Sequence, residues 1–446
     1  MSEMKLNEAF VRQMEQLLPP DELNRFLTAL DDPPTLALRV NPLRPAAMEA
    51  SRAFISDPVP WAKCGYYLKA DARPGASIAH DLGAFYLQEA SAMIAAAALD
   101  AQPGEKILDL CAAPGGKTTQ IACAMRGQGL LVSNEPVAAR GRMLRENIER
   151  MGIINAVAVS AWPEQLAERW PNTFDAILVD APCSGEGMFR RDPGARTEWK
   201  EDAPEGCARR QADILDAAAR MLRPGGRLVY STCTFNRTEN EGSVEAFLER
   251  HPEFSAEDFV LPGAGASSGG MLRIWPHLQR GDGHFAARLR KDVAPERSRS
   301  AGRRARADAR RQNTENLEPL LARLEAESCR IPEALRGGTL IRQADYIHML
   351  PQGTPPLDGI RTLKPGLCLM KAGRSHVQPM PALARACGSD GLAWQATALR
   401  RVEIDEEAAQ CLKQGERLRL ENRDPGWTLC EFHGLPAGFV KALPAT

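Results

Sequence analysis

Apolar and polar positions alternate in two ways between residues 91 and about 291. Short apolar runs without a polar interruption, such as Ile177-Leu-Val179, are separated by longer stretches in which apolar residues recur every three or four positions. The short runs predict strands that helices cover on both faces, and the longer stretches predict the amphipathic helices between them. We therefore expect an α/β region built on a mainly parallel, doubly wound sheet.

The same alternation gives the position of each expected element. Strands are expected at Lys106–Leu110, Gly129–Glu135, Ala156–Ser160, Phe174–Asp180 and Arg227–Thr234. Helices are expected at Lys117–Met125, Val137–Arg150, Gly206–Leu222 and Glu239–His251. Because proline and glycine end helices, Pro224-Gly-Gly226 is expected to stop the third helix. Two later runs, Met271–Trp275 and His284–Arg290, are expected to form an antiparallel edge.

The segment before this region has a mixed pattern. Residues 1–90 contain a helical spacing of Phe10, Met14 and Leu17, followed by an extended apolar run at residues 36–40. A helical period and a strand-like run in a segment of this length indicate a small α/β domain. We expect this domain to precede residues 91–291 in the chain and to take part in RNA recognition.

The segments after residue 291 change in composition. Seven arginines lie between residues 297 and 311, and residues 292–313 are typical of a solvated linker, although arginines of this kind also suit phosphate contacts. An intermediate segment is expected at 314–375. A final module is expected at 376–446, with a strand-like run at Gly426–Phe432.

Composition limits what the protein can be. With 446 residues, the chain is too long for one compact domain, and about 150 residues per domain suggests roughly three. Apolar residues at 44% and charged residues at 25% are ordinary for a globular chain. The formal net charge is −1, so any contact with nucleic acid must come from local patches.

The cysteines and histidines indicate in which cellular compartment the protein works and whether a metal site is expected. The eleven cysteines include no CxxC pair, and the seven histidines include no HExxH. The first twenty residues do not read as a signal peptide, and no apolar run approaches the roughly 20 residues of a membrane helix. We expect a cytoplasmic monomer with free thiols, no metal and no membrane contact.

The stretch from Lys106 to Thr118 carries the clearest chemistry. A strand ends, the chain turns through Pro114, Gly115 and Gly116, and a helix begins. This geometry directs backbone N–H groups at a ligand beyond the carboxyl end of the strand. Gly115 and Gly116 have no Cβ, so a ligand can approach the main chain closely.

Two ligand classes could use this turn. Gly116-Lys-Thr118 is similar to the end of a nucleoside-triphosphate loop, but that motif requires a glycine five positions earlier, where Cys111 stands. S-adenosylmethionine needs no phosphate cradle and does need a carboxylate for its ribose. Glu135 ends the next strand, nineteen positions after Gly116, where dinucleotide folds place that acid. Alternatively, Glu135 merely caps the turn at Pro136.

Two cysteines follow neighbouring strands. Asp180-Ala-Pro-Cys183 ends the fourth expected strand, and Ser231-Thr-Cys233 ends the fifth. In a doubly wound sheet these ends adjoin the glycine turn, so Asp180, Cys183 and Cys233 would share one cleft with the methyl donor. No aromatic residue follows Asp180-Ala-Pro, as stacking on an amino-group substrate would require. Carbon 5 of a pyrimidine must be activated by a thiolate that adds to carbon 6.

These motifs resemble those of the Sun/NSUN family of RNA cytosine-5 methyltransferases. The resemblance covers most of residues 36–291, and the wider layout is similar to the bacterial ribosomal RNA methyltransferase F branch, including a carboxyl-terminal PUA-like module that closes with Gly434–Lys441. It implies a Rossmann-like methyltransferase domain. The stretches that carry it are Cys111-Ala-Ala-Pro-Gly-Gly-Lys117, Asp180-Ala-Pro-Cys-Ser-Gly185, Ser231-Thr-Cys-Thr234, Tyr86–Ser91, Arg273–His277 and Gly281–Phe285.

The resemblance also implies a role for each site residue. Cys233 would be the nucleophile, Cys183 would promote product release, and Asp180 would contact both cofactor and cytosine. The residues expected to hold S-adenosylmethionine are Cys111, Ala112, Ala113, Pro114, Gly115, Gly116, Lys117, Glu135 and Asp180. Many members carry an aspartate for the adenine where this chain has Trp162, so either backbone groups suffice there or the indole packs on the adenine.

The expected substrate is RNA with an unpaired or flipped-out cytosine, since a stacked base cannot reach a thiol in a cleft. Small-subunit (16S) ribosomal RNA is the first hypothesis, and transfer RNA is the alternative with the same chemistry. A non-catalytic assembly factor that binds RNA is a third, but it would need neither cysteine. Arg190, Arg191 and Arg196 are either ordinary surface charge or contacts to the RNA backbone.

Overall fold

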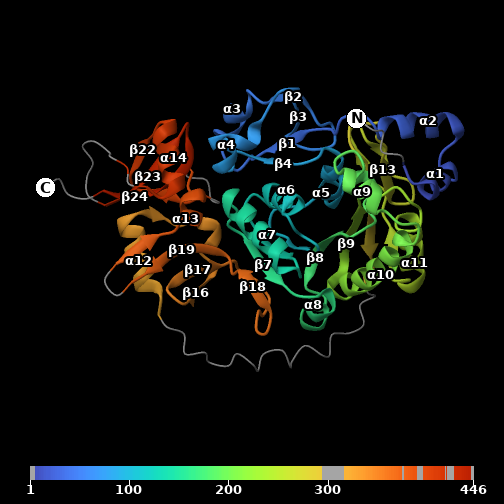
Figure 1. Cartoon of the computed structure of the whole chain (residues 1–446). Coiled ribbons are helices and arrows are strands. Elements are labelled where there is room, and N and C mark those ends of the chain that lie inside the picture. The colour runs from blue at the N-terminus through green and yellow to red at the C-terminus, as the bar shows by residue number, and fades with distance from the viewer. Residues whose placement is uncertain are drawn as a thin grey trace, which may run out of the picture.

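The computed structural model describes residues 6–293, 316–373, 376–388, 395–416, 418 and 426–442. The linker arginines between residues 297 and 311 lie outside the described residues. Figure 1 shows a central sheet with helices on both faces, a small sheet from the N-terminal segment above it, and the C-terminal elements on one side. The C-terminal elements lie next to the N-terminal sheet, although the whole central domain separates them in sequence.

The central sheet has nine strands among the described residues, in the order β10-β14-β9-β8-β5-β6-β7-β18, with β13 paired to β14. The pairs among β5 to β9 are parallel, whereas β14 is antiparallel to β9 and to β13. The predicted mainly parallel sheet with an antiparallel edge is therefore confirmed. The strands are β5 (Lys106–Asp109), β6 (Leu130–Asn134), β7 (Ala156–Ser160), β8 (Phe174–Asp180), β9 (Leu222–Thr232), β10 (Phe254–Ala256), β13 (Met271–Ile274), β14 (His284–Lys291) and β18 (Arg361–Lys364).

Apolar helix faces cover both sides of this sheet. Ile94, Ile121 and Leu144 belong to one buried cluster, and Leu215 and Phe247 belong to the other. Strand β5 lies centrally, with β6 and β7 on one side and β8 and β9 on the other. Ligands of such sheets bind where the strand order reverses, here beyond the carboxyl ends of β5 and β8. The first face carries α5 (Ile94–Leu99), α6 (Gly116–Met125) and α7 (Ala138–Arg150), and the second carries α8 (Pro163–Arg169), α10 (Ala203–Met221) and α11 (Glu241–Arg250).

One local prediction was wrong. Pro224-Gly-Gly226 does not stop the helix, because α10 already ends at Met221 and β9 begins at Leu222. The three residues instead lie inside β9, where its pairing with β8 shifts register between Phe174 and Ala176. Gly225 has a φ of 75°. A bulge leaves extra residues unpaired and tolerates this left-handed conformation, so the proline and glycines kink a strand.

The N-terminal segment divides into two structural parts. Four strands form an antiparallel sheet in the order β2-β3-β1-β4. The first two helices pack elsewhere, because Phe10 and Phe26 contact Phe189 and Phe235 of the central domain. Figure 1 shows these helices beside β13, apart from the small sheet. The elements are α1 (Glu8–Glu15), α2 (Pro20–Ala29), β1 (Ala37–Val40), α3 (Ala47–Ser51), β2 (Ile55–Pro58), β3 (Gly65–Leu68), α4 (Ile78–Asp81) and β4 (Phe85–Leu87).

The C-terminal elements are joined to both preceding parts. β18 pairs antiparallel with β7 and adds an edge strand that the sequence did not predict. Val402, Cys430 and Leu435 share one buried cluster with Leu38 and Phe85 of the N-terminal sheet. The predicted strand at Gly426–Phe432 is confirmed. The remaining elements include α12 (Glu318–Glu327), β16 (Thr339–Gln343), β17 (Tyr346–Leu350), β19 (Leu367–Ala372), β20 (Val377–Pro379), α13 (Pro381–Arg385), β22 (Arg401–Glu403), α14 (Glu406–Gln414), β23 (Gly426–Phe432) and β24 (Leu435–Ala442).

Candidate active site

The glycine turn leads from the end of β5 into α6. Gly115 precedes the helix with a φ of 114°, a conformation that favours glycine. Helix α7 holds the outer side of the turn, because Arg140 Nη2 donates to Ala113 O at 3.0 Å and Asn147 Nδ2 donates to Pro114 O at 2.9 Å. These two side chains bind carbonyl oxygens of the turn and therefore do not occupy the N–H groups at the start of α6.

The N-terminal sheet supports the turn from the other side. Arg39 in β1 is only 1% exposed and reaches across to the start of α6. Its Nη2 donates to Gly116 O at 3.1 Å and to Thr119 Oγ1 at 2.6 Å, and its Nε donates to Gln88 Oε1 at 3.3 Å. Sequence reasoning missed Arg39, since nothing in the run at residues 36–40 indicates that this arginine turns inward.

The turn offers groups that fit S-adenosylmethionine. Because α6 begins at Gly116, the N–H groups of its first turn have no partner within the helix and can bind a carboxylate. Asp109 is fully buried; its Oδ2 accepts from Thr118 Oγ1 at 2.6 Å, while its Oδ1 has no hydrogen-bond partner. Burial raises the pKa of Asp109 to about 7. A buried carboxyl with one free oxygen suits the ammonium group of an amino acid.

Glu135 lies at the end of β6 and is almost fully buried. Its Oε1 accepts from Val137 N at 2.9 Å, and its Oε2 lies 3.4 Å from Arg140 Nη1. The capping geometry considered from the sequence is therefore present. The structure does not thereby exclude the ribose role, because a carboxylate oxygen accepts more than one hydrogen bond.

Trp162 follows β7 and precedes α8, with 62% of the residue exposed. The chain leading to it is tied to the end of β6, because Ala161 N donates to Asn134 Oδ1 at 3.0 Å and Ser160 Oγ donates to Pro136 O at 3.2 Å. The backbone that leads to Trp162 is thus held next to the end of β6. The role of the indole at an adenine stays a prediction.

Asp180 ends β8 and lies in a dense polar cluster. Its Oδ2 accepts from Lys117 Nζ at 2.7 Å, and its Oδ1 accepts from Ser231 Oγ at 2.8 Å. His284 Nε2 lies 3.6 Å from the same Oδ1. Burial alone would raise the pKa of Asp180, but Lys117 and His284 hold that pKa well below its usual range. Burial lowers the pKa of His284, which favours a neutral imidazole.

The two cysteine sulfurs meet beside this cluster. Cys183 Sγ and Cys233 Sγ are 3.4 Å apart, and both cysteines are free thiols, partly accessible to solvent. The hydrogen bond with Cys233 raises the pKa of Cys183, and burial raises it further. The structure therefore brings together Asp180 and the two cysteines, as the sequence predicts, and it adds Lys117 to this group.

Two buried glutamates fasten the loops that carry the cysteines. Glu239 accepts from Ser184 N at 3.0 Å and from Gln211 Nε2 at 2.7 Å. Glu186 Oε2 accepts from Phe235 N at 2.7 Å and from Asn236 N at 3.0 Å. Each carboxylate thus joins the loop after β8 to the chain after β9. Sequence reasoning missed both, although two glutamates lie within six residues after Cys183 and Cys233.

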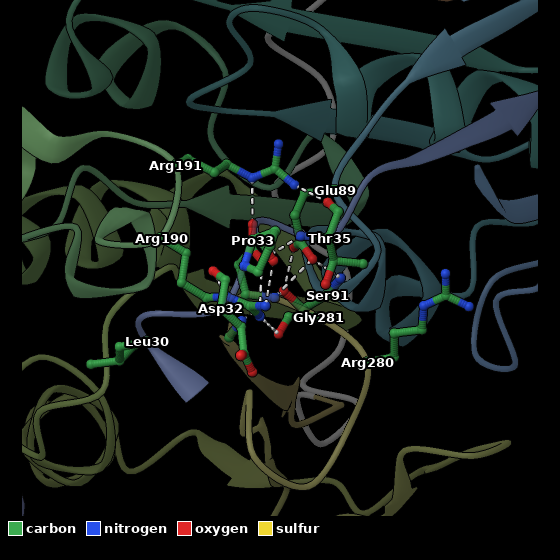
Figure 2. A network of polar contacts seen from close by, with 12 residues as sticks. Leu30, Asp32, Pro33, Thr35, Glu89, Ser91, Arg190, Arg191, Arg280 and Gly281 are labelled. Atoms are coloured by element: carbon green, nitrogen blue, oxygen red, sulfur yellow. Dashed lines mark hydrogen bonds and ion pairs between the residues drawn. The ribbon is translucent and has the colours of Figure 1, made fainter. Parts of the chain in front are cut away.

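The three arginines after Cys183 are not ordinary surface charge, so that interpretation is wrong. Arg190 donates to Gly281 O at 2.9 Å and to Pro33 O at 2.7 Å, and it pairs with Asp282 at 3.2 Å. Arg196 is likewise bound to Asp31, Leu30 O and Phe189 O. Figure 2 shows Arg190 and Arg191 directed at the segment from Asp32 to Thr35, with Gly281 beside it. These guanidinium groups donate hydrogen bonds to backbone carbonyls at a partly buried junction between the N-terminal segment and the central domain.

Within the described ranges, no three or more His, Cys, Asp or Glu side chains gather in a way that could hold a metal ion. Among the same residues, no helix combines the length and the apolar character that crossing a membrane requires.

Comparison with known proteins decides the family. Residues 96–290 match the family described as 16S rRNA methyltransferase RsmB/F, and residues 6–90 match the N-terminal domain of 16S rRNA methyltransferase RsmF. A ribosomal RNA small subunit methyltransferase F from Shewanella amazonensis is 32% identical, over 99% of this chain and 96% of that protein. This chain belongs to the 16S rRNA methyltransferase F family. A namesake from Citrobacter koseri is 40% identical over 64% of each chain.

Solved structures agree with the fold of the central domain. A methyltransferase homolog protein from Pyrococcus horikoshii has a TM-score of 0.55 and 29% identity, and the match covers 64% of this chain and 100% of that one. NSun6 from the same organism, solved with the S-adenosylmethionine analogue SFG, has a TM-score of 0.57, with 64% and 98% coverage; at 23% identity it supports the fold alone. The family comprises S-adenosylmethionine-dependent methyltransferases.

Proposed function

We propose that this enzyme methylates carbon 5 of a cytosine in 16S ribosomal RNA, through a covalent bond between Cys233 and carbon 6 of the ring. The observation that supports the proposal is the 3.4 Å contact between the sulfurs of Cys183 and Cys233, next to the Lys117–Asp180 pair. Transfer to an exocyclic amino group needs no thiol. Transfer to carbon 5 needs a nucleophile for carbon 6, and a second group that assists its departure.

The contact between the two sulfurs affects the acidity of Cys183. Its hydrogen bond with Cys233 and its burial raise the pKa of Cys183, which favours a protonated Cys183 thiol in the free enzyme. A thiol that keeps its proton is a poor nucleophile, so Cys183 is better suited to release than to attack. This agrees with the roles that the family resemblance implies, with Cys233 as the nucleophile.

Asp180 is suited to hold the cytosine ring. Since Lys117 keeps it ionised, Asp180 can only accept hydrogen bonds, and a protonated N3 of the cytosine is the donor that matches it. The proton that the Cys233 thiol loses passes to N3, which draws electrons from carbon 6, where the thiolate adds; N3 gives this proton up again when Cys233 leaves. The electron pair of the former double bond is then available on carbon 5, and it forms the bond to the methyl group that S-adenosylmethionine supplies.

Release requires the loss of the proton on carbon 5 and then of the Cys233 sulfur. Once Cys233 Sγ is bonded to carbon 6, the hydrogen bond between the two thiols, which raises the pKa of Cys183, is lost. The Cys183 thiol can then lose its proton to the cleft, and the resulting thiolate can take the proton from carbon 5. The electrons of that C–H bond restore the ring double bond and expel Cys233 as a thiolate.

The ribosomal substrate is supported by the names of the relatives, which specify the small ribosomal subunit. We therefore favour 16S ribosomal RNA over transfer RNA, and we place the activity in the cytoplasm, where bacterial ribosomal subunits are found. A non-catalytic assembly factor is disfavoured, because its function would not require two adjacent thiols backed by buried carboxylates.

The test is product analysis. Small ribosomal subunits from a strain without this gene are incubated with the full chain and S-adenosylmethionine, and the 16S RNA is examined by bisulfite sequencing and by nucleoside mass spectrometry. We expect new 5-methylcytosine at one or a few positions. A methyl group found on another atom, or only on transfer RNA in a parallel reaction, would contradict the proposal.

A further inference from the structure

A cavity of about 340 Å³ lies between the N-terminal sheet and the loop after β8. It is outside the cofactor region, because no residue from Cys111 to Lys117, nor Glu135, contributes to its lining. Its size is near the lower end of the range for small-molecule sites, roughly 300–1,000 Å³. We call it the N-terminal pocket and define it by Leu36, Leu68, Leu87, Arg73 and Arg191.

One wall of the N-terminal pocket is apolar and accessible. Leu36, at the entry to β1, is 47% exposed, and Leu87, at the end of β4, is 37% exposed. The two strands are paired so that Leu38 faces Leu87 across the ladder. Large aliphatic side chains on neighbouring strands leave a flat apolar surface, on which one face of a planar ring can pack.

Two arginines also line the pocket. Arg73 is exposed, and its side chain has no hydrogen-bond or ion-pair partner among the described residues. Arg191 binds Asp282 through Nε and Thr35 O through Nη2, so its guanidinium is oriented. Its remaining nitrogen has no contact in Figure 2 and points away from the network. An oriented arginine with a free nitrogen is well suited to a phosphate oxygen.

The oxygens of Glu89, the acid in the pocket wall, are occupied by backbone N–H groups and not by the arginines of the pocket. Glu89 Oε1 accepts from Ser91 N at 2.9 Å and from Asp282 N at 3.0 Å, and its Oε2 accepts from Ala92 N at 2.9 Å. Figure 2 shows Glu89 directed into this network. The pocket therefore combines an apolar wall with cationic groups at its edge.

A chain of contacts links the N-terminal pocket to the backbone of Cys233. Asp282, which orients Arg191, is followed by Gly283. Gly187 N donates to Cys233 O at 2.8 Å, and a Cβ at Gly187 would lie 2.9 Å from Cys233 O and 3.1 Å from Gly283 O. The segment that holds Arg191 thus also touches the backbone of Cys233.

We propose that the N-terminal pocket binds an unpaired nucleotide of the RNA substrate that neighbours the target cytosine. The base packs on Leu36 and Leu87, and the phosphate contacts Arg73 and Arg191. This inference rests on the proposed function and adds a second, sequence-adjacent base site to it. A nucleotide matches the pocket because it combines a flat apolar face with an anionic group, which the apolar wall and the free guanidinium nitrogens complement.

The experiment compares variants on a protein-free 16S RNA transcript and on small subunits from the deletion strain. Arg73→Glu and Leu87→Glu each place a negative charge in the pocket. Methyl transfer from tritiated S-adenosylmethionine gives KM for RNA and kcat, and calorimetry gives the Kd for the cofactor. We expect KM for RNA to rise about tenfold or more in both variants, with kcat within about twofold and an unchanged cofactor Kd. Arg73→Lys should retain most of the RNA affinity.

The matched control is Arg52→Glu, which reverses an arginine of the same domain whose side chain is 72% exposed and outside the pocket. It should leave KM for RNA within about twofold. An unchanged KM for Arg73→Glu and Leu87→Glu in an active enzyme overturns the pocket assignment and leaves the proposed function intact. A KM change on subunits but not on the transcript also overturns it, because the pocket would then bind a ribosomal protein. A wild-type chain that methylates neither substrate refutes the proposed function.

Discussion

The strand ends that carry the cysteines differ from those that face the cofactor edge. After β8 and β9, the backbone N–H groups of Ser184, Phe235 and Asn236 are bound by two buried glutamates. After β6 and β7, Glu135 is held by a turn N–H and by a half-exposed arginine, and Trp162 is mostly exposed. The first pair of ends is tied together by buried carboxylates, whereas no hydrogen bond of this kind joins Glu135 to Trp162 among the contacts described above.

This difference matches the demands of the two ligands. A thiolate that attacks a ring carbon must be placed within a few tenths of an ångström, and preorganised loops avoid the cost of ordering it during the reaction. A cofactor that binds and leaves in every cycle needs groups that can release it. Substitutions at the cysteine loops should therefore affect catalysis most, and substitutions at the cofactor edge should affect cofactor affinity.

The largest effect is expected for Cys233→Ala. Without a nucleophile for carbon 6, methyl transfer should fall by about 10⁴-fold or more, while the cofactor Kd stays within about twofold. The measurement is tritium transfer to 16S RNA, with calorimetry for the cofactor. Cys411→Ala removes a cysteine of α14 and should behave as wild type. Turnover near the wild-type rate would reject Cys233 as the nucleophile.

Cys183→Ala separates attack from release. Cys233 can still add to carbon 6, but the group that takes the carbon 5 proton is missing, so turnover should fall by about 10²–10⁴-fold and a protein–RNA adduct should accumulate. Denaturing gels with labelled RNA detect this adduct. The double variant with Cys233→Ala should form none. If Cys183→Ala turns over without any adduct, its role in release is refuted.

Glu239→Gln tests the preorganisation of the cysteine loops. A glutamine places an NH₂ group against Ser184 N, Gln211 Nε2 or Asn236 Nδ2, all of which are donors. We expect the free energy of unfolding to fall by about 1–3 kcal/mol in urea titrations, together with a lower kcat. The comparison variant is Glu245→Gln on the exposed side of α11, which should change stability by less than about 0.5 kcal/mol.

Glu135→Ala tests the cofactor edge. If the carboxylate binds the ribose, the affinity for S-adenosylmethionine should weaken by about 1–3 kcal/mol in calorimetry, since a charged hydrogen bond is lost. Glu146→Ala on the exposed face of α7 is the matched control. An unchanged Kd would leave Glu135 with only the cap on Val137 N that the structure shows.

The smallest effect is expected at Trp162. Trp162→Ala should weaken cofactor binding by about 1 kcal/mol if the indole stacks on the adenine, and Trp162→Phe should restore most of it. Stability in urea should change little, because the residue is mostly exposed. Equal cofactor affinity in both variants and the wild type would assign adenine recognition to backbone groups instead.

Much of the central fold follows from local patterns. β7 and β8 have the predicted bounds, and most other strands and helices of this domain differ from prediction by three residues or fewer. Pro224-Gly-Gly226 was misjudged, because the same residues that end a helix also form a bulge. β18 was missed, since an edge strand of four residues carries no periodicity long enough to identify it.

The residues of the site also divide into those that the sequence could place and those that it could not. Asp180, Cys183 and Cys233 could be placed together from the sequence, because parallel strands put their carboxyl ends at one edge. Arg39, Glu186 and Glu239 could not, since whether a charged side chain turns inward depends on partners far away in the sequence. Arg190 and Arg196 are the opposite case. In the sequence they could be ordinary surface charges, but in the structure they donate to backbone carbonyls of other segments.

The sequence by itself determined the α/β class, the strand ends that carry the reactive groups and the family to which those motifs belong. Such features depend on hydrophobic period and on short spacings, which act within one or two neighbouring elements. Only the tertiary structure decided the 3.4 Å contact between the sulfurs, the support of the glycine turn by Arg39, and the pocket beside Arg191. These depend on hydrogen bonds and packing between segments distant in the chain, and no local pattern encodes them.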